Sequence, residues 1–332
     1  MNIVEDKRLL GQYFTITNPF DTVAFYKWIE EVEGLTNETI ILEPFAGANN
    51  IPKMIIDAGI LTNNWKCFDI SPSEENKCEN FVIEERDTIQ DFPKGFDIAI
   101  TNPPYLSKNS AARRNLEYPK TDYDDMYKLC LDKMLENCKY VAAIIPETFI
   151  ASGQFTDRLK YVVSLTCKMF DDTECPVCLA MFNKDKTEDF TIYQMNDSLG
   201  NYSDLCKGKI DTHYQAAWKI NDPLGEIGIV CIDNTKKESI YFCKGDNIDS
   251  SKIKVSSRSL TRVSGLPKDI DLDLFINKCN EILVKYRLET KDVFMASFKG
   301  LRADNKYRRR LDFATAKQIM SKALEAIHNE EN

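Results

Sequence analysis

The first half of the chain alternates short apolar, β-branched runs with segments of helical spacing. The expected strands cover residues 39–43, 65–70, 81–83, 96–101 and 140–145, and the expected helices cover residues 52–58 and 123–138. The run 140–145 is apolar throughout, as in a parallel strand buried on both faces, and Pro146 ends it. Strands that alternate with helices predict an α/β fold, a Rossmann-like, doubly wound and mostly parallel sheet covered on both faces.

Two further apolar runs, 162–170 and 178–182, flank the polar segment Asp171-Asp172-Thr173-Glu174. Polar residues between two β-rich runs predict an antiparallel hairpin, which would close the sheet at its end.

The pattern changes after about residue 189. Short β-like pieces at 191–193, 227–232 and 239–243 lie among Asn, Asp, Gly and Ser, and from Asp271 onward the pattern is helical. We therefore expect a catalytic domain at 1–189 and a smaller C-terminal region at 190–332.

The charge is divided unevenly along the chain. The 332 residues carry a net charge of −9, but residues 251–332 contain 17 Lys/Arg against 11 Asp/Glu, a net of +6, which leaves −15 for the rest. A basic tail on an acidic body favours contact with a polyanion such as nucleic acid, although a solvated basic helix face gives the same count.

Cysteine usage and apolar runs restrict the class of protein. The eleven cysteines are an odd number scattered through apolar segments, which favours reduced thiols in a cytoplasmic protein. With only His213 and His328 in the chain, the Cys175–Cys178 pair does not predict a metal site. We expect no membrane span, because no apolar run nears the roughly 20 residues of a span. We expect no secretory signal, because residues 1–7 contain no basic stretch followed by an apolar core.

Candidate chemistry begins at Asn102-Pro103-Pro104-Tyr105, directly after the run 96–101. Two consecutive prolines fix φ and remove backbone donors, so they end the strand in a rigid turn. The turn leaves an amide side chain and backbone carbonyls beside an aromatic ring. Such a site has acceptors and no strong nucleophile, which suits holding a planar amine while the amine attacks an electrophile.

This turn resembles the catalytic motif of S-adenosylmethionine-dependent amino-methyltransferases, chiefly the DNA N6-adenine enzymes. The resemblance implies that the Asn102 oxygen and the Pro103 carbonyl accept hydrogen bonds from the target amine. Pro104 would stiffen the turn, and Tyr105 would stack on the base. The base would have to flip out of a duplex, with aromatic faces replacing its lost stacking.

Residues 43–50 form a second candidate site, at the carboxyl end of the first expected strand. That is where an open α/β sheet binds ligands, since small residues admit close approach and a helix N-terminus adds donors. Only Gly47 is present of the three glycines in a dinucleotide fingerprint, which argues against a dehydrogenase.

The segment instead resembles the methyltransferase cofactor loop, Asp/Glu-Pro-x-x-Gly-x-Gly, with Asn49 in the place of the last glycine. Asn tolerates left-handed backbone better than most residues. The resemblance implies S-adenosylmethionine as cofactor, with Asp69 accepting from the ribose hydroxyls and Asp87 from the adenine amino group. The implied cofactor residues are Tyr13, Thr15, Glu43, Pro44, Phe45, Ala46, Gly47, Asp69, Asp87 and Asn102.

Segments on either side extend the resemblance over residues 10–183. Residues 10–15 resemble the segment that folds over the methionine moiety of the cofactor, with Tyr13 packing on it and Thr15 bonding its carboxylate; an N-terminal edge strand is the alternative. Phe170 matches the second aromatic that contacts the flipped base, although a role as an ordinary core residue is the equal alternative. The order of these segments is that of the gamma class, and residues 145–149 match a further family segment.

The C-terminal region shows dense basic stretches at 256–262 and 299–310. They suit phosphate contact more than base identification, and the candidate DNA-backbone residues are Arg258, Arg262, Lys299, Arg302, Lys306, Arg308, Arg309 and Arg310. The predicted function is site-specific DNA adenine-N6 methylation, with duplex DNA and a cognate restriction endonuclease as functional partners. The open alternatives are an RNA or protein-glutamine methyltransferase and a catalytically dead, cofactor-binding subunit.

Overall fold

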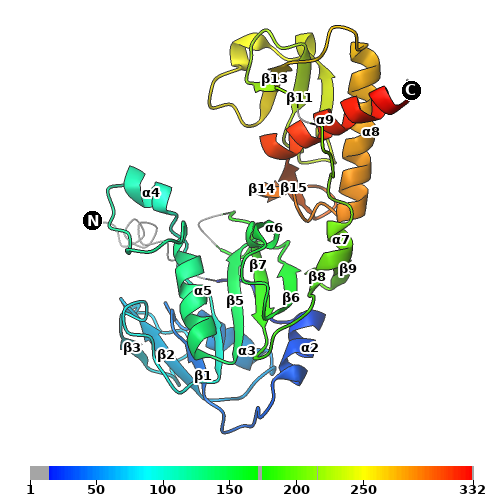
Figure 1. Ribbon diagram of the computed structural model, residues 1–332. Coiled ribbons are helices and arrows are strands. Elements are labelled where there is room, and N and C mark those ends of the chain that lie inside the picture. Colours follow the sequence, from blue (N-terminus) through cyan, green and yellow to red (C-terminus); the bar gives the residue numbers. More distant parts are fainter. Residues whose placement is uncertain (1–14, 171–173, 215, 331–332) are drawn as a thin grey trace. The chain divides into compact units, whose positions relative to one another are not determined.

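The computed structural model describes residues 15–170, 174–214 and 216–330 (Figure 1). The chain divides into two compact units, Met1–Asn201 (unit 1) and Tyr202–Asn332 (unit 2). Among the described residues, no helix combines the length and apolar content needed to cross a membrane.

Unit 1 is built on a nine-stranded sheet in the order β3-β2-β1-β4-β5-β7-β6-β8-β9. Strands β1 to β5 run parallel, and β7 pairs antiparallel with both β5 and β6. The bounds are β1 Ile41–Glu43, β2 Trp65–Asp69, β3 Ile83–Glu85, β4 Ile98–Thr101, β5 Tyr140–Pro146, β6 Leu159–Ser164, β7 Val177–Phe182, β8 Thr191–Gln194 and β9 Asp197–Asn201.

Helices cover both faces of this sheet. Figure 1 shows α5 in front of the strands and α3 behind them. Every residue of β4 and β7 is buried, which explains their continuous apolar sequence. The helices are α2 Val23–Glu31, α3 Asn50–Asp57, α4 Lys108–Arg113, α5 Met126–Asn137 and α6 Phe149–Ser152. The predicted Rossmann-like sheet is confirmed, and β6 and β7 form the expected antiparallel pair. The pair does not close the sheet, however, because β8 and β9 continue it beyond β6.

Some elements of unit 1 differ from the sequence expectation. Helix α2 was not expected; it is short, has no side-chain cap, and buries Ala24, Phe25 and Trp28. The compact unit continues to Asn201 rather than residue 189, because β8 pairs with β6 and carries β9 with it. Local composition marks the polar loop before β8 but does not show that the sheet resumes after it.

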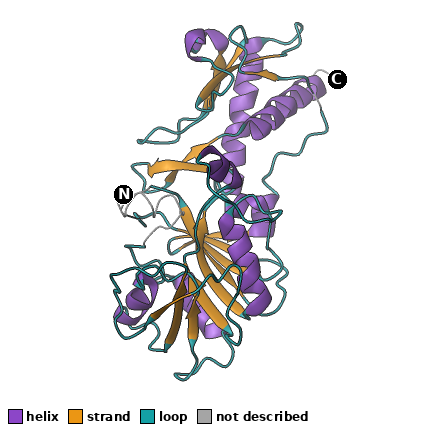
Figure 2. Ribbon diagram, turned by 90° about the vertical axis from the view of Figure 1, so that its left-hand side faces the viewer, coloured by secondary structure: helices purple, strands orange, loops and turns teal. Residues whose placement is uncertain are grey.

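Unit 2 has its own core. A four-stranded antiparallel sheet, ordered β10-β13-β11-β12, packs with α8 and α9 around buried residues such as Phe275, Ile319 and Leu324 (Figure 2). A separate pair, β14 and β15, completes the unit. The bounds are α7 Tyr202–Cys206, β10 Lys219–Ile220, β11 Ile227–Val230, β12 Tyr241–Lys244, η1 Gly245–Asn247, η2 Ser250–Lys252, β13 Leu260–Ser264, α8 Leu272–Thr290, β14 Ala296–Leu301, β15 Tyr307–Arg310 and α9 Phe313–Glu330.

The pair β14–β15 corrects the expectation of a helical chain from Asp271 onward. Gly300 has φ +81° and Asn305 has φ +59°, and both conformations interrupt a right-handed helix. A bulge lies between Phe298 and Leu301, and the strands pair around it. The second basic stretch is therefore a twisted hairpin.

Candidate active site

A cavity in unit 1 opens at the carboxyl ends of β1, β2 and β4. Most of the expected cofactor residues line it, together with residues that the sequence did not single out. The lining residues are Thr15, Glu43, Phe45, Ala46, Gly47, Asn50, Ile51, Asp69, Ile70, Asp87, Thr88, Ile89, Asn102, Pro104 and Met126. The place is the one expected for a ligand in an open α/β sheet.

The loop after β1 has the backbone shape that its sequence suggested. Gly47 has φ +54°, and Asn49, in the last glycine position of the motif, has φ +58° and ψ +32° as the N-cap of α3. The Asn49 amide donates to Asn76 Oδ1 at 3.0 Å and to the Phe81 carbonyl at 2.9 Å. The asparagine therefore keeps the left-handed turn and ties the loop to a neighbouring segment.

Two carboxylates are held at the strand ends by backbone donors. Asp69 Oδ2 accepts from Gly47 N and Oδ1 from Ser71 N, both at 2.8 Å. Asp87 Oδ1 accepts from Ile89 N and Gln90 N, both at 3.1 Å. Both side chains line the cavity with fixed orientation, so they are preset acceptors for hydroxyl or amino donors.

Glu43 is the most deeply buried acid of the cavity, with 1 % of its surface exposed. Its carboxylate accepts hydrogen bonds from Thr101 Oγ1 and, at 3.1 Å, from Phe45 N. Burial raises the pKa of Glu43 to about 8; these two hydrogen bonds oppose the rise, and the charge of Asp69 adds to it. A cation in the cavity would therefore favour the ionised form.

The turn after β4 is rigid and tightly bonded. Asn102 and Pro104 line the cavity, and Pro103 is buried. The Tyr105 hydroxyl lies 2.5 Å from Asn102 Oδ1 and 2.7 Å from the Ile144 carbonyl on β5. The turn is thus fixed at both ends, by β4 and by β5.

Tyr105 and Phe170, the expected base-stacking pair, lie together. Their ring centroids are 6.2 Å apart in an edge-to-face arrangement, and Tyr127 lies 6.5 Å from Tyr105 on another side. Tyr105 is 8 % exposed and Phe170 is fully buried. Stacking on a base would therefore require the surrounding side chains to move.

Thr15 brings the N-terminal segment to the same cavity. Asn102 Nδ2 donates to Thr15 Oγ1 over 3.4 Å, and Thr15 forms an antiparallel bridge with Phe170. Thr15 is 2 % exposed. Tyr13, the other residue expected here, lies outside the described residues.

Several cavity residues were missed from the sequence. Asn50 and Ile51 continue the cofactor loop, while Ile70 and Ile89 follow the two aspartates within two positions, so adjacency could have found them. Met126 begins α5, and only the packing of that helix brings it to the cavity.

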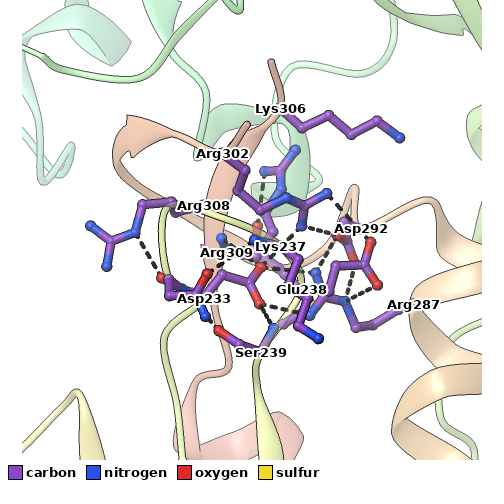
Figure 3. A network of polar contacts seen from close by, with 12 residues as sticks. Asp233, Lys237, Glu238, Ser239, Arg287, Asp292, Arg302, Lys306, Arg308 and Arg309 are labelled. Atoms are coloured by element: carbon purple, nitrogen blue, oxygen red, sulfur yellow. Dashed lines mark hydrogen bonds and ion pairs between the residues drawn. The ribbon is translucent and has the colours of Figure 1, made fainter. Parts of the chain in front are cut away.

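The basic residues of unit 2 differ in exposure, and two of the candidate DNA-backbone residues are buried. Arg302 is 3 % and Arg309 7 % exposed. Arg302 donates to Asp233 at 3.1 Å (Figure 3). Arg302 also donates to Asp304 at 2.8 Å, and Arg309 donates to Ser297 Oγ at 2.6 Å. Carboxylates and hydroxyls of unit 2 already bind these two guanidinium groups. Arg302 and Arg309 therefore stabilise unit 2 from within.

Asp233 is the centre of this network, with no exposed surface. It accepts from Arg287 at 2.9 and 3.0 Å, from Arg302, and from Ser239 N (Figure 3). Burial alone would raise the pKa of Asp233, but hydrogen bonds from Arg287 and backbone donors outweigh it and the pKa is lowered. The network joins α8, the loop after β11 and the hairpin.

The remaining basic residues are placed differently. Arg262 is bound by the Ile248 and Pro223 carbonyls, and Arg308 donates to the Asp233 carbonyl at 2.7 Å. Arg310 is half-buried on β15. The exposed members of the expected set are Arg258, Lys299 and Lys306, and the structure adds the exposed Lys236 and Lys237 on the loop that Asp233 anchors.

Comparison with known proteins identifies the class of the central segment. Residues 31–169 match the family model described as Eco57I restriction-modification methylase. The match takes in β1 to β5 and the Asn102–Tyr105 turn, and less than half of the 332 residues. It confirms the predicted resemblance to restriction-modification methylases over this segment, and S-adenosylmethionine is the cofactor that it indicates. No curated protein matches the chain.

Solved structures match part of the chain at low identity. A type I restriction-modification methyltransferase subunit from Streptococcus thermophilus is 16 % identical with TM-score 0.39, over 54 % of this chain and 47 % of that one. The type IIG restriction endonuclease BpuSI is 16 % identical with TM-score 0.40, over 56 % and 27 %. An rRNA methylase from Streptococcus thermophilus is 15 % identical with TM-score 0.32, over 52 % and 99 %. The chain thus spans less than half of either restriction-modification protein.

Proposed function

We propose that this protein transfers a methyl group from S-adenosylmethionine to the N6 amine of an adenine flipped out of duplex DNA, as the modification enzyme of a restriction-modification system. The observation that carries the proposal is the cavity in unit 1, where the loop after β1 and the Asn102–Tyr105 turn meet inside the segment related to methylases.

The cavity suits the proposed cofactor in charge and in hydrogen bonding. Its described lining holds three acidic side chains, Glu43, Asp69 and Asp87, and no Lys, Arg or His. Such a lining fits a cationic ligand that carries hydroxyl and amino donors. Ile70 and Ile89 supply apolar contact beside the two aspartates, as a planar base requires.

S-adenosylmethionine, when bound, supplies an electrophilic methyl group. The chain's own task is then to orient the amine. In our proposal the Asn102 amide oxygen and the Pro103 carbonyl accept hydrogen bonds from the target amine, and direct its lone pair toward the cavity. Proton loss from the methylated amine needs no strong base, because the alkylated aminium is itself strongly acidic.

The target base would stack on Tyr105 and contact Phe170. Because both rings are buried, base entry in this proposal separates side chains that now pack against each other. Separation of these aromatic side chains would thus add to the free-energy cost of flipping the base into the site.

We assign DNA contact to the C-terminal region beginning at about residue 190, where unit 2 provides the exposed cations. Arg258, Lys299, Lys306, Lys236 and Lys237 would meet phosphates, and half-buried Arg308 and Arg310 would contribute in part. Arg262, Arg302 and Arg309 would support these residues from within the unit. The same proposal includes a cognate endonuclease as functional partner. It also includes a cytoplasmic location, which the eleven free cysteine thiols support, because thiols stay reduced in that compartment.

The deciding experiment is transfer of radiolabelled methyl from S-adenosylmethionine to duplex DNA, RNA and protein, followed by nucleoside analysis. We expect N6-methyladenine in duplex DNA. Label confined to RNA or to protein glutamine would replace DNA as the substrate and overturn the proposal.

The matched control is Asn102→Ala. It should abolish transfer while S-adenosylhomocysteine binding, measured by calorimetry, is largely retained, because Asn102 borders the cofactor region but acts on the amine. Turnover that survives this substitution would exclude the proposed role of the turn.

A further inference from the structure

Asn50 has no assigned role, yet it holds a central contact of the cavity. It is the first residue of α3, and its Nδ2 donates to the Thr15 carbonyl at 2.8 Å. Because a carbonyl can only accept, this contact fixes which end of the amide carries the nitrogen. Asn50 thus links the cofactor loop to the N-terminal segment.

Thr15 passes this link on to two other parts of the site. Its Oγ1 accepts from Asn102 Nδ2, and its backbone bridges to Phe170. The next residues continue the pairing, since Ile16 N donates to the Met169 carbonyl at 2.9 Å and Thr17 Oγ1 to the Lys168 carbonyl at 2.5 Å. Thr15 therefore contacts the cofactor loop, the Asn102–Tyr105 turn and the segment that carries Phe170.

The Asn50 side chain is not arranged for stability alone. Its Oδ1 is buried, and no hydrogen-bond partner for it occurs among the residues that the structure describes. Asn63, which makes the same kind of contact elsewhere in unit 1, donates to two carbonyls, of Thr36 and Thr39, at 2.6 and 3.0 Å. An unpaired buried amide oxygen is costly, and at a residue that lines the cavity it points to a role beyond stability.

We propose that Asn50 is a positioning residue that holds Thr15 and thereby couples the cofactor loop to Asn102 and Phe170. The catalytic consequence of this coupling rests on the proposed methyl transfer. The contact between Asn50 and Thr15 does not depend on it. Because Asn50 holds Thr15 against the cofactor loop, loss of the Asn50 contact should weaken cofactor binding and displace the target-side groups together.

The first test uses hydrogen exchange of the protein alone. Asn50→Asp keeps the side-chain size but replaces the donor by an acceptor that faces the Thr15 carbonyl, and Asn50→Ala removes the contact. We expect the Ile16 amide to exchange at least about tenfold faster in both variants. Asn63→Ala, the matched control, should leave Ile16 unchanged. Wild-type exchange at Ile16 in both Asn50 variants would overturn the proposal.

The second test measures coupling. In Asn50→Asp and Asn50→Ala, the calorimetric dissociation constant of S-adenosylhomocysteine should rise about tenfold, and kcat should fall while KM for duplex DNA stays near the wild-type value. Unchanged affinity and kcat would reduce Asn50 to a structural residue. If the wild-type protein methylates no DNA, the proposed function fails, whereas exchange and calorimetry still decide the role of Asn50.

Discussion

Thr101, the last residue of β4, donates a hydrogen bond from Oγ1 to the carboxylate of Glu43 at the end of β1. The bond joins the strand that leads into the Asn102–Tyr105 turn to the strand that leads into the cofactor loop. It also holds a buried acid whose pKa burial raises to about 8.

This pKa predicts how the stability of unit 1 changes with pH. Between about pH 4.5 and about pH 8, Glu43 is ionised in the unfolded chain but protonated in the folded one, so the folded state holds one more proton. The contribution of Glu43 to the free energy of unfolding is therefore complete below about pH 4.5. As pH rises this contribution falls by up to about 1.4 kcal/mol per pH unit, and it is lost as pH passes through about 8.

The measurement is urea unfolding of the wild type and of Glu43→Gln at several values of pH. Because glutamine does not titrate, the difference in unfolding free energy between the two proteins should change with pH over this window. A difference that is constant from pH 5 to pH 8 would show that Glu43 ionises at its ordinary pKa.

The Tyr105 hydroxyl predicts a loss of turnover that ring stacking does not explain. Tyr105→Phe keeps the aromatic ring but removes the contacts to Asn102 Oδ1 and to the Ile144 carbonyl. If these contacts orient the Asn102 amide, kcat should fall about tenfold or more with KM for the cofactor little changed.

The control for this variant is Tyr161→Phe. The Tyr161 hydroxyl donates to Glu31 Oε1 at 2.6 Å, and neither residue lines the cavity. Loss of this hydroxyl should therefore cost about 1 kcal/mol of stability and leave turnover intact. Equal kcat for Tyr105→Phe and the wild type would assign Tyr105 to stacking only.

Much of unit 1 could be predicted because the chemistry there is local in sequence. Glu43 and Asp69 are the last residues of buried strands, and Asn102 directly follows another. Parallel strands end at one edge of the sheet, so the meeting of these three residues follows from the strand pattern. Tertiary packing decided the rest: Met126 reaches the cavity only because α5 lies over the sheet, and the contact of Asn50 with Thr15 joins residues 35 positions apart.

Unit 2 was less predictable because charge counts carry no information about pairing. Arg302 and Arg308 look alike in the sequence, yet one is buried against Asp233 and the other is half-exposed beside it. The acid that separates their roles lies 69 positions before Arg302. A charge run gives the sign of a region, and the fold decides which members reach solvent.

The buried network predicts a large effect of removing its central acid. Asp233→Ala leaves Arg287 and Arg302 buried with fewer partners, which should destabilise unit 2 by about 3–5 kcal/mol. Lys252→Ala, which breaks an exposed pair with Asp249, should change stability by less than about 1 kcal/mol. The free energy of chemical unfolding of each variant, followed by circular dichroism, separates the two effects. A small effect of Asp233→Ala would mean that the network contributes little to stability.

The exposed lysines predict the salt dependence of DNA binding. A triple alanine substitution of Arg308, Arg309 and Arg310 would weaken DNA binding but also remove the buried Arg309, so it combines an effect on folding with an effect on recognition.

The double variant Lys299→Ala/Lys306→Ala alters exposed side chains only. It should weaken DNA binding and lower the slope of log affinity against log salt by about 2. The double control Lys285→Ala/Lys317→Ala removes the same charge from α8 and α9 and should leave the slope unchanged. Filter binding across a salt titration measures both, and equal slopes for the two double variants would place the phosphate contacts outside the hairpin.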